Sequence, residues 1–369
     1  MALVAEIAGT PPQCDEWDSF VTAHPSGTHW HLSWWLQHHR RWFRRASVVM
    51  VRRDGRIVAG TAVHHLGPSV RGCSVAVVTN GPLVHPGDEV ALDALLDALV
   101  RDAERSGSML LQFEAFDAGL YERLRHYFSG WETALEPIWN LYHPGVWREI
   151  RIPLAGMTPD ELFRKFNRTC RKQIRRAEEV GVEVSEGCDD ATVRRAYDAW
   201  VASAARQGYA PRPYEDFLGL TRTAADHGMA KFLVASVGGR TAAFLFSIFY
   251  RVGAAALYTG YTEEHAEIPC SRLLHWRTMV DAIGQGIPYL TLMAPGRGGG
   301  LKFKQDFHAA LVNNSRFMTV VLRPRMVRLA VPFITSPRWA AGLKWLLLSR
   351  RGQAQGDAGS TENASSSTA

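Results

Sequence analysis

The chain has 369 residues, of which 46% are hydrophobic and 21% charged, and this balance is typical of a globular protein and excludes a chain that is disordered overall. At roughly 150 residues per domain, the length predicts two domains and an additional segment. The formal net charge is +6, but seven basic residues and no acidic one lie from Arg164 to Arg176, and eight basic residues and no acidic one lie between Asp306 and Asp357. Such concentrated positive charge favours an anionic partner at both places.

The first unit, residues 1–147, alternates helical and extended patterns. Helices are expected at 17–23, 33–43 and 90–106, and strands at 46–51, 56–63, 75–79 and 109–114. Asp54-Gly55 lies between two of these strands and predicts a tight hairpin turn. The unit is therefore expected to fold around one mixed, mainly antiparallel sheet.

The second unit, residues 148–324, repeats this order. Strands are expected at 149–153, 182–185, 231–237, 241–250 and 254–261, and helices at 161–180, 191–207 and 271–285. Thr158-Pro159-Asp160-Glu161 marks a helix start, with proline in the first turn and acidic residues at the positive end of the helix dipole. The repeated order suggests an old duplication and predicts a second sheet of the same kind, with the helix at 161–180 near the interface of the two units.

The last part of the chain differs in composition from both units. Residues 325–351 combine Leu and Trp with Arg and Lys, which predicts a basic, apolar helical segment that Pro332 and Pro337 interrupt. Two roles are open for this segment: peripheral contact with an anionic membrane surface, or packing against the second domain. Residues 352–369 are mainly small and polar, and we expect a disordered tail.

The sequence also bears on compartment and metal binding. No apolar run approaches the roughly 20 residues of a membrane-spanning helix, and no basic flank precedes an apolar stretch at the N-terminus, so neither a transmembrane segment nor a signal peptide is expected. The five cysteines lie far apart without a Cys-x-x-Cys pair, which argues against structural zinc and disulfides. The sequence predicts a cytoplasmic protein without a bound metal.

The expected helix at 161–180 is the most informative segment. Arg164, Arg168, Arg171 and Arg175 follow one another at intervals that place them on one helix face. A second stripe is apolar and suited to packing on a sheet: Phe163, Phe166, Cys170, Ile174 and Ala177. Solvated basic faces usually carry acidic residues for i,i+4 pairing, and none occurs in the 13 residues from Arg164 to Arg176. A phosphate-bearing ligand, nucleotide or RNA is favoured over an idle surface, with Arg168, Arg171, Lys172 and Arg175 as candidate contacts.

The same segment carries a resemblance to a known family. Residues 162–184 resemble the helix-to-strand segment of the FemABX-like family, and four further stretches agree in order with that family. These are His24-Pro25-Ser26-Gly27-Thr28, Gly81-Pro82-Leu83, Gly260-Tyr261, and Phe303-Lys304-Gln305-Asp306-Phe307, which fits the family's Phe-Lys-x-x-Phe element. The resemblance covers roughly residues 15 to 320.

The resemblance implies an α+β fold with two tandem GNAT-like acyltransferase domains. It further implies an aminoacyltransferase that moves an aminoacyl group from aminoacyl-tRNA to an amine-bearing acceptor, either a peptidoglycan precursor or a specialised peptide or natural-product intermediate, with no other cofactor. Two alternatives remain open. One is a GNAT-type N-acyltransferase that uses CoA or another carrier thioester, and the other is a non-catalytic accessory protein of envelope or polysaccharide assembly.

Amide formation on an acyl ester builds an oxyanion, which needs a fixed positive donor more than it needs a protein nucleophile. Lys304 is the candidate because it matches the lysine that lies at the reaction centre in relatives, with Phe303 beside it. An ion pair between Lys304 and Asp306 is the structural alternative. Tyr258 and Tyr261 are candidate hydroxyl donors or acceptor contacts.

Two departures from the family pattern concern the acceptor. Relatives often carry Gln where His31 stands, and commonly an acidic residue in the strand at 289–293. His31 and Trp35 are expected in a pocket wall, so a specialised acceptor is favoured. No Gln/Arg-x-x-Gly-x-Gly/Ala loop of the kind that binds the CoA pyrophosphate follows a strand, and the glycines at 296–300 count only weakly for CoA.

Overall fold

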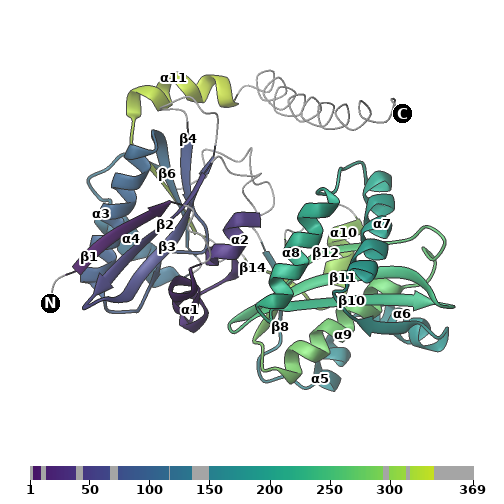
Figure 1. Cartoon of the computed structure of the whole chain (residues 1–369). Coiled ribbons are helices and arrows are strands. Elements are labelled where there is room, and N and C mark those ends of the chain that lie inside the picture. The colour runs from purple at the N-terminus through teal and green to yellow at the C-terminus, as the bar shows by residue number, and fades with distance from the viewer. Residues whose placement is uncertain are drawn as a thin grey trace, which may run out of the picture.

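The computed structural model of the chain describes residues 3–9, 14–38, 45–66, 74–115, 117–134, 149–293, 299–312 and 316–335. Two mixed sheets, each flanked by helices, form two units (Figure 1). The α+β class expected from the sequence is confirmed. The expected unit boundary at 147/148, most of the segment 325–351, and the whole of 352–369 lie outside the described residues.

The first sheet has the order β1-β2-β3-β4-β6-β15-β7, and β5 pairs with β3. Its strands are β1 (Leu3–Gly9), β2 (Arg45–Arg53), β3 (Arg56–Leu66), β4 (Ser74–Val78), β5 (Leu83–Val84), β6 (Ser108–Ala115), β7 (Thr133–Ala134) and β15 (Arg316–Val321). The accompanying helices are α1 (Asp15–Ala23), the 3-10 turn η1 (His29–His31), α2 (Ser33–His38), α3 (Glu89–Arg105), α4 (Ala118–Tyr127) and α11 (Pro324–Thr335). Asp54 and Gly55 have φ of 50° and 81°, as the hairpin between β2 and β3 requires.

The second sheet has the order β14-β8-β13-β12-β11-β10-β9. Its strands are β8 (Glu149–Pro153), β9 (Glu183–Glu186), β10 (Ala230–Val237), β11 (Arg240–Tyr250), β12 (Gly253–Tyr261), β13 (Tyr289–Thr291) and β14 (Ala310–Val312). Its helices are α5 (Pro159–Lys165), α6 (Arg168–Glu179), α7 (Asp190–Gln207), α8 (Tyr214–Asp226), α9 (Cys270–Gly284) and α10 (Gly299–Gln305). As in the first sheet, one described strand pair is parallel, here β12 with β13.

The expected single helix at 161–180 is wrong in one respect, because the chain breaks it into α5 and α6. Phe166 is extended, with ψ of 150°, and Asn167 caps α6 by accepting a hydrogen bond from the backbone N–H of Cys170 at 2.7 Å. Arg164 therefore lies on α5 and not on the face shared by Arg168 and Arg175. The periodicity could not show this break, since Asn is tolerated within helices as well as favoured at their starts.

The strand β15 corrects the expected division of the chain. Residues 316–321 fall within the expected second unit, yet β15 pairs antiparallel with β6 and β7 of the first sheet. The chain thus returns to the first unit after completing the second. Such pairing depends on contacts between residues far apart in sequence, which local patterns do not encode.

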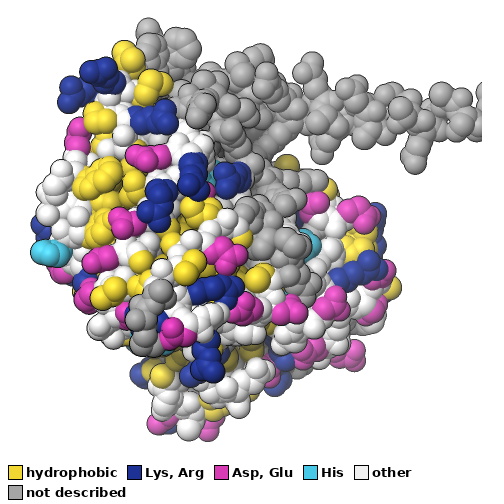
Figure 2. All heavy atoms as spheres, turned by 60° about the vertical axis from the view of Figure 1, so that its left-hand side comes forward, with side chains coloured by type: hydrophobic (Ala, Val, Ile, Leu, Met, Phe, Trp, Pro, Cys, Tyr) yellow, Lys and Arg dark blue, Asp and Glu magenta, His cyan; other side chains and the backbone are white. Residues whose placement is uncertain are grey.

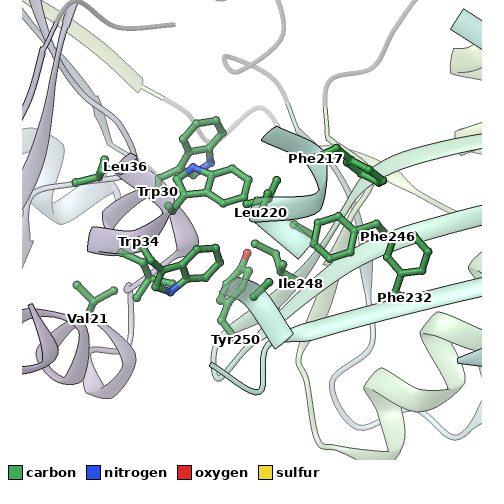
Figure 3. Packing of buried hydrophobic residues seen from close by; sticks show 14 of the residues in the cluster. Val21, Trp30, Trp34, Leu36, Phe217, Leu220, Phe232, Phe246, Ile248 and Tyr250 are labelled. Atoms are coloured by element: carbon green, nitrogen blue, oxygen red, sulfur yellow. The ribbon is translucent and has the colours of Figure 1, made fainter. Parts of the chain in front are cut away.

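A shared core joins the two units. Val21, Trp30 and Trp34 of the first unit pack in one buried cluster with Phe217 and Tyr250 of the second (Figure 3). Helix α2 lies against α8 at this interface. Helix α6 instead packs on α9 and contributes to a separate cluster within the second unit, so its expected position near the interface is wrong.

The described residues on the outer face of the first unit carry charges of both signs. Figure 2 turns this unit forward and shows Lys and Arg interspersed with Asp and Glu across the visible face. Arg123 with Glu89 and Arg52 with Glu16 are examples of such pairs on this unit. This mixture contrasts with the surface of α6 described below.

Candidate active site

A pocket of about 610 Å³ opens where the parallel strands β12 and β13 diverge. They pair at only two positions, Ala254 with Leu290 and Ala255 with Thr291, after which β13 ends while β12 continues to Tyr261. In the first sheet the corresponding parallel pair, β4 with β6, is bonded along the whole of β4. The divergence therefore belongs to the second unit, and it exposes an edge of β12 to a ligand.

A β-bulge shapes the wall of this pocket. Phe246 of β11 pairs with Tyr258 and Ser247 pairs with Ala256, so Leu257 is an extra residue in β12. A bulge of this kind changes the direction in which the following side chains point. The Tyr258 ring consequently packs against Trp200, with ring centroids 4.8 Å apart, and burial raises the pKa of its hydroxyl.

Four of the residues expected from the sequence to form the site line this one pocket: Tyr258, Tyr261, Phe303 and Lys304. Tyr258 belongs to the wall, whereas Tyr261 is 36% exposed and lies at the rim. The guanidinium of Arg206 lies 4.8 Å from the centre of the Tyr261 ring and donates a hydrogen bond to the Tyr261 carbonyl at 2.7 Å. The rim is therefore aromatic and positively charged.

Lys304 projects from α10 into the pocket. Its Nζ donates a hydrogen bond to the backbone carbonyl of Leu292, directly after β13. Burial lowers the pKa of Lys304 to about 8, because the charged form loses water on entering the pocket. Lys304 is thus still mainly protonated at neutral pH and can present a cation in a partly dry site.

Asp306 does not form the ion pair with Lys304 that was the structural alternative for this lysine. Its carboxylate forms an ion pair with Arg272 at 2.7 Å and bonds to the side chain of Asn167, and no ion pair joins it to Lys304 among the described residues. The backbone N–H of Asn167 also donates to the Asp306 carbonyl at 3.1 Å. Asp306 therefore fastens the start of α6 to the end of α10, the helix that carries Lys304.

The basic residues of α6 form a second hollow, of about 520 Å³, which we call the α6 basic surface. It is lined by Arg168, Arg171, Lys172, Arg175, Arg176 and Glu179. All four candidate phosphate contacts are thus brought together. Arg171 is partly engaged already, because it donates to the carbonyls of Arg164, at 2.9 Å, and of Phe166. The start of α6 is tied to Asp306, two residues after Lys304, so the helix of this surface is anchored to the end of the helix that carries Lys304.

His31 and Trp35 lie outside both hollows, contrary to the expectation of a pocket wall. They are 0% and 1% exposed and belong to the core shared by the two units. Burial lowers the pKa of His31 to about 3, and its Nδ1 lies 3.2 Å from the Thr28 hydroxyl. The sequence around His31 and Trp35 did not predict their position in the core, because a run of aromatic residues is compatible with a core and with a pocket wall.

His275 is a titratable pocket residue that the sequence analysis did not predict. His275 of α9 lines the pocket, is 4% exposed, and has its pKa lowered to about 4, chiefly by burial. Its Nδ1 lies 2.7 Å from the Ser271 carbonyl, one helical turn earlier. The sequence around His275 carries no motif that would mark this histidine as a site residue. It lines a pocket only because β12 and β13 diverge in the folded chain.

Comparison with known proteins bears on this architecture. Residues 164–305 match the family model of an acetyltransferase (GNAT) domain. The crystal structure of FemX superposes with a TM-score of 0.75 at 14% identity, over 90% of this chain and 100% of that chain. The chain has a tandem GNAT fold. The fold implied by the resemblance to the FemABX-like family is thereby confirmed.

A conserved protein of unknown function from Bacteroides thetaiotaomicron VPI-5482 is also similar, with a TM-score of 0.60 at 12% identity, over 83% of this chain and 96% of that chain. No curated protein matches the sequence. The matched GNAT segment contains both the α6 basic surface and Lys304. An acyltransferase with a pocket in its second GNAT domain is what these findings support.

The described residues show neither a metal-binding cluster nor a membrane-spanning helix. No group of His, Cys, Asp or Glu in the described ranges is arranged to hold a metal ion. Within the same ranges, no helix has both the length and the apolar character needed to cross a bilayer.

Proposed function

We propose that the protein is an aminoacyltransferase that moves an aminoacyl group from aminoacyl-tRNA to the amine of an acceptor, forming an amide bond. The acceptor is a peptidoglycan precursor or a specialised peptide or natural-product intermediate. The observation that carries the proposal is the hydrogen-bonded link between α10, which carries the cation of the pocket, and α6, which carries the basic surface. Lys304 lies in the pocket, and the helix of the α6 basic surface is capped by Asn167, which Asp306 ties to the helix of Lys304.

The pocket suits the chemistry of this reaction. The amine attacks the acyl carbonyl carbon, and negative charge develops on the carbonyl oxygen. A preorganised cation in a site of low dielectric stabilises that charge far better than water does. Lys304 supplies the cation, while the aromatic walls formed by Phe303 and Tyr258 exclude water. The proton of the amine leaves with the ribose oxygen, so no protein nucleophile is needed.

The α6 basic surface suits the donor. A tRNA presents one phosphate per nucleotide along its single-stranded end, and each phosphate that a Lys or Arg neutralises releases condensed counterions. Lys172, Arg175 and Arg176 are exposed and lie on one side of a helix that has no acidic residue before Glu178. Such a surface binds the phosphates of a nucleic acid without distinguishing its bases, which suits binding of tRNA through its backbone.

A CoA- or thioester-dependent N-acyltransferase is the second candidate, and the match to the GNAT family model favours it. One feature of the chain weighs against CoA. A pyrophosphate binds best at the N-terminus of a helix, where N–H groups are free. The loop before α9, which follows the open strand β12, instead carries Glu263, Glu264 and Glu267, and their charge repels a pyrophosphate.

Donor identity is tested by incubating the purified protein with radiolabelled aminoacyl-tRNA mixtures and total cell metabolites, with and without ribonuclease. We expect labelled amide product that ribonuclease abolishes. Product formation from acyl-CoA that resists ribonuclease would replace this proposal by the second candidate. Absence of turnover with either donor, together with a co-purifying envelope protein, would favour the non-catalytic accessory role.

Location follows from the donor. An aminoacyl-tRNA donor would place the reaction in the cytoplasm, and we further propose a peripheral contact of residues 325–351 with an anionic membrane surface. In the described part, Val327 is buried against the first unit while Arg325, Arg328 and Leu329 are exposed. Flotation with phosphatidylglycerol vesicles tests this contact. Loss of flotation in the double variant Arg325→Ala/Arg328→Ala supports it, and equal flotation contradicts it.

A further inference from the structure

His275 is held in the pocket with its imidazole ring in one orientation. The ring packs against Phe303 and Phe307, at centroid distances of 5.2 and 5.7 Å, and the side chain comes from α9 on the pocket wall. His275 is 4% exposed and is one of the residues that line the pocket. A polar ring placed so firmly in an aromatic wall needs a partner for each nitrogen.

The hydrogen bond to Ser271 determines which nitrogen carries the proton. A backbone carbonyl can only accept, so the 2.7 Å contact requires an N–H at Nδ1 of His275. Burial and the nearby charges of Lys304 and Arg272 lower the pKa of the ring to about 4, so the imidazole is neutral at physiological pH. A neutral imidazole with Nδ1–H has a lone pair on Nε2.

Nε2 is therefore the acceptor nitrogen of a side chain that lines the pocket. Among the described residues, none forms a hydrogen bond with it, whereas Nδ1 is satisfied within the helix. The pocket thus offers a fixed donor, the Lys304 ammonium, and a fixed acceptor, the His275 Nε2. Amide formation presents the matching pair, a carbonyl oxygen that gains negative charge and an amine N–H.

We propose that Nε2 of His275 accepts a hydrogen bond from the amine of the acyl acceptor and orients its lone pair towards the acyl carbon held by Lys304. This inference rests on the proposed N-acyl transfer. The nitrogen forms a bond to the acyl carbon, the bond from that carbon to the leaving oxygen or sulfur breaks, and the amine proton ends on the leaving group. His275 is neutral before and after the reaction and positions the amine.

This arrangement also selects the protonation state of the acceptor. A second cation beside the Lys304 ammonium would be repelled in a pocket of low dielectric. The acceptor amine is therefore bound as the free base, which is the form that can attack. A single neutral acceptor at Nε2 is sufficient for such an amine, and a carboxylate in its place would instead favour the unreactive ammonium.

Two variants at the same position separate this role from packing. His275→Gln keeps an acceptor near the place of Nε2, whereas His275→Phe keeps the aromatic contacts with Phe303 and Phe307 and removes the acceptor. We expect His275→Phe to lower kcat/KM for the amine about tenfold, as the loss of one hydrogen bond does, with KM for the acyl donor unchanged. His275→Gln should stay within about threefold of the natural protein. Equal losses in both variants, or no loss in His275→Phe, would overturn the proposal.

A second measurement decides the matter without turnover. In the full chain labelled with 15N-histidine, NMR reports which nitrogen of His275 is protonated, with His275→Phe providing the assignment. We expect the Nδ1–H form, and a shift of the Nε2 resonance on titration with glycinamide as a simple amine. An Nε2–H form, or no response to glycinamide, would refute the role of His275. Failure of the proposed function would appear separately, as absence of turnover with both donors in the natural protein.

Discussion

Replacing Lys304 by Met is the perturbation that bears most directly on the chemistry. Met fills the space of the lysine side chain and removes only the ammonium group that donates to the Leu292 carbonyl. Loss of one preorganised oxyanion donor lowers kcat by roughly 10²- to 10³-fold. We expect a loss of that size for Lys304→Met, with an unchanged melting temperature.

The pKa of Lys304 also predicts how turnover depends on pH. With a pKa of about 8, about nine tenths of the side chains are charged at pH 7 and about one tenth at pH 9. If the charged form is the active one, turnover of the natural protein falls about fivefold from pH 8 to pH 9 once the acceptor amine is already neutral. Lys304→Met should show no such fall.

The assay is initial rate of amide formation between pH 6.5 and 9.5 with aminoacyl-tRNA and the acceptor found in the metabolite screen. Lys302→Met is the matched control, because Lys302 is an exposed lysine on the same helix and does not line the pocket. It should keep normal turnover and the normal pH profile. A Lys304→Met protein with normal melting and normal turnover would refute the assignment of Lys304 as oxyanion donor.

Three further predictions concern binding and stability. Replacing Arg168 and Arg175 together by Ala should weaken RNA binding and reduce the slope of log K against log salt by up to about 1.4, at about 0.7 per phosphate contact on a single strand. Fluorescence titration measures this slope, and an unchanged slope would mean that the α6 basic surface does not bind phosphates. Burial lowers the pKa of His29 to about 3, so below pH 6.5 the unfolded chain binds a proton that the folded chain does not, and the free energy of unfolding falls as the pH is lowered. Urea unfolding should show that His29→Phe reduces the loss of stability between pH 7 and pH 5 by about 2 kcal/mol, whereas His126→Gln, at an exposed histidine, should not change this loss. Asn167→Ala removes the cap of α6 and a partner of Asp306, and should lower the free energy of unfolding by about 1 to 2 kcal/mol; no change would mean that α6 starts equally well without this cap.

The elements with strong local signals were predicted well. The helix α3 and the hairpin of β2 and β3 appear where periodicity and the Asp54-Gly55 turn placed them, because these features depend on residues close together in the sequence. Weakly patterned elements such as β1, α4 and α8 were missed. Tyr214–Asp226, which forms α8, starts after Pro213 without a capping side chain, so its start gave little signal.

The residues of the candidate site likewise include some that the sequence predicted and others that only the structure revealed. Lys304 and Phe303 were found through a short motif, and the basic residues of α6 through their charge and spacing, which are properties of the chain itself. His275 was not found, because its importance arises from the place where α9 meets the open edge of β12. His31 and Trp35 were assigned to a pocket wall, and only the packing of the two units showed that they belong to the core between them.

The sequence by itself determined the order of most helices and strands, the concentration of positive charge on α6, and the lysine that faces the pocket. The tertiary structure decided where the pocket is, since it depends on β13 ending at Thr291 while β12 runs on to Tyr261. It also decided that β15 joins the first sheet and that Asp306 links α6 to α10. These are contacts between residues distant in the chain, and their free energy comes from burial and pairing that exist only in the folded state.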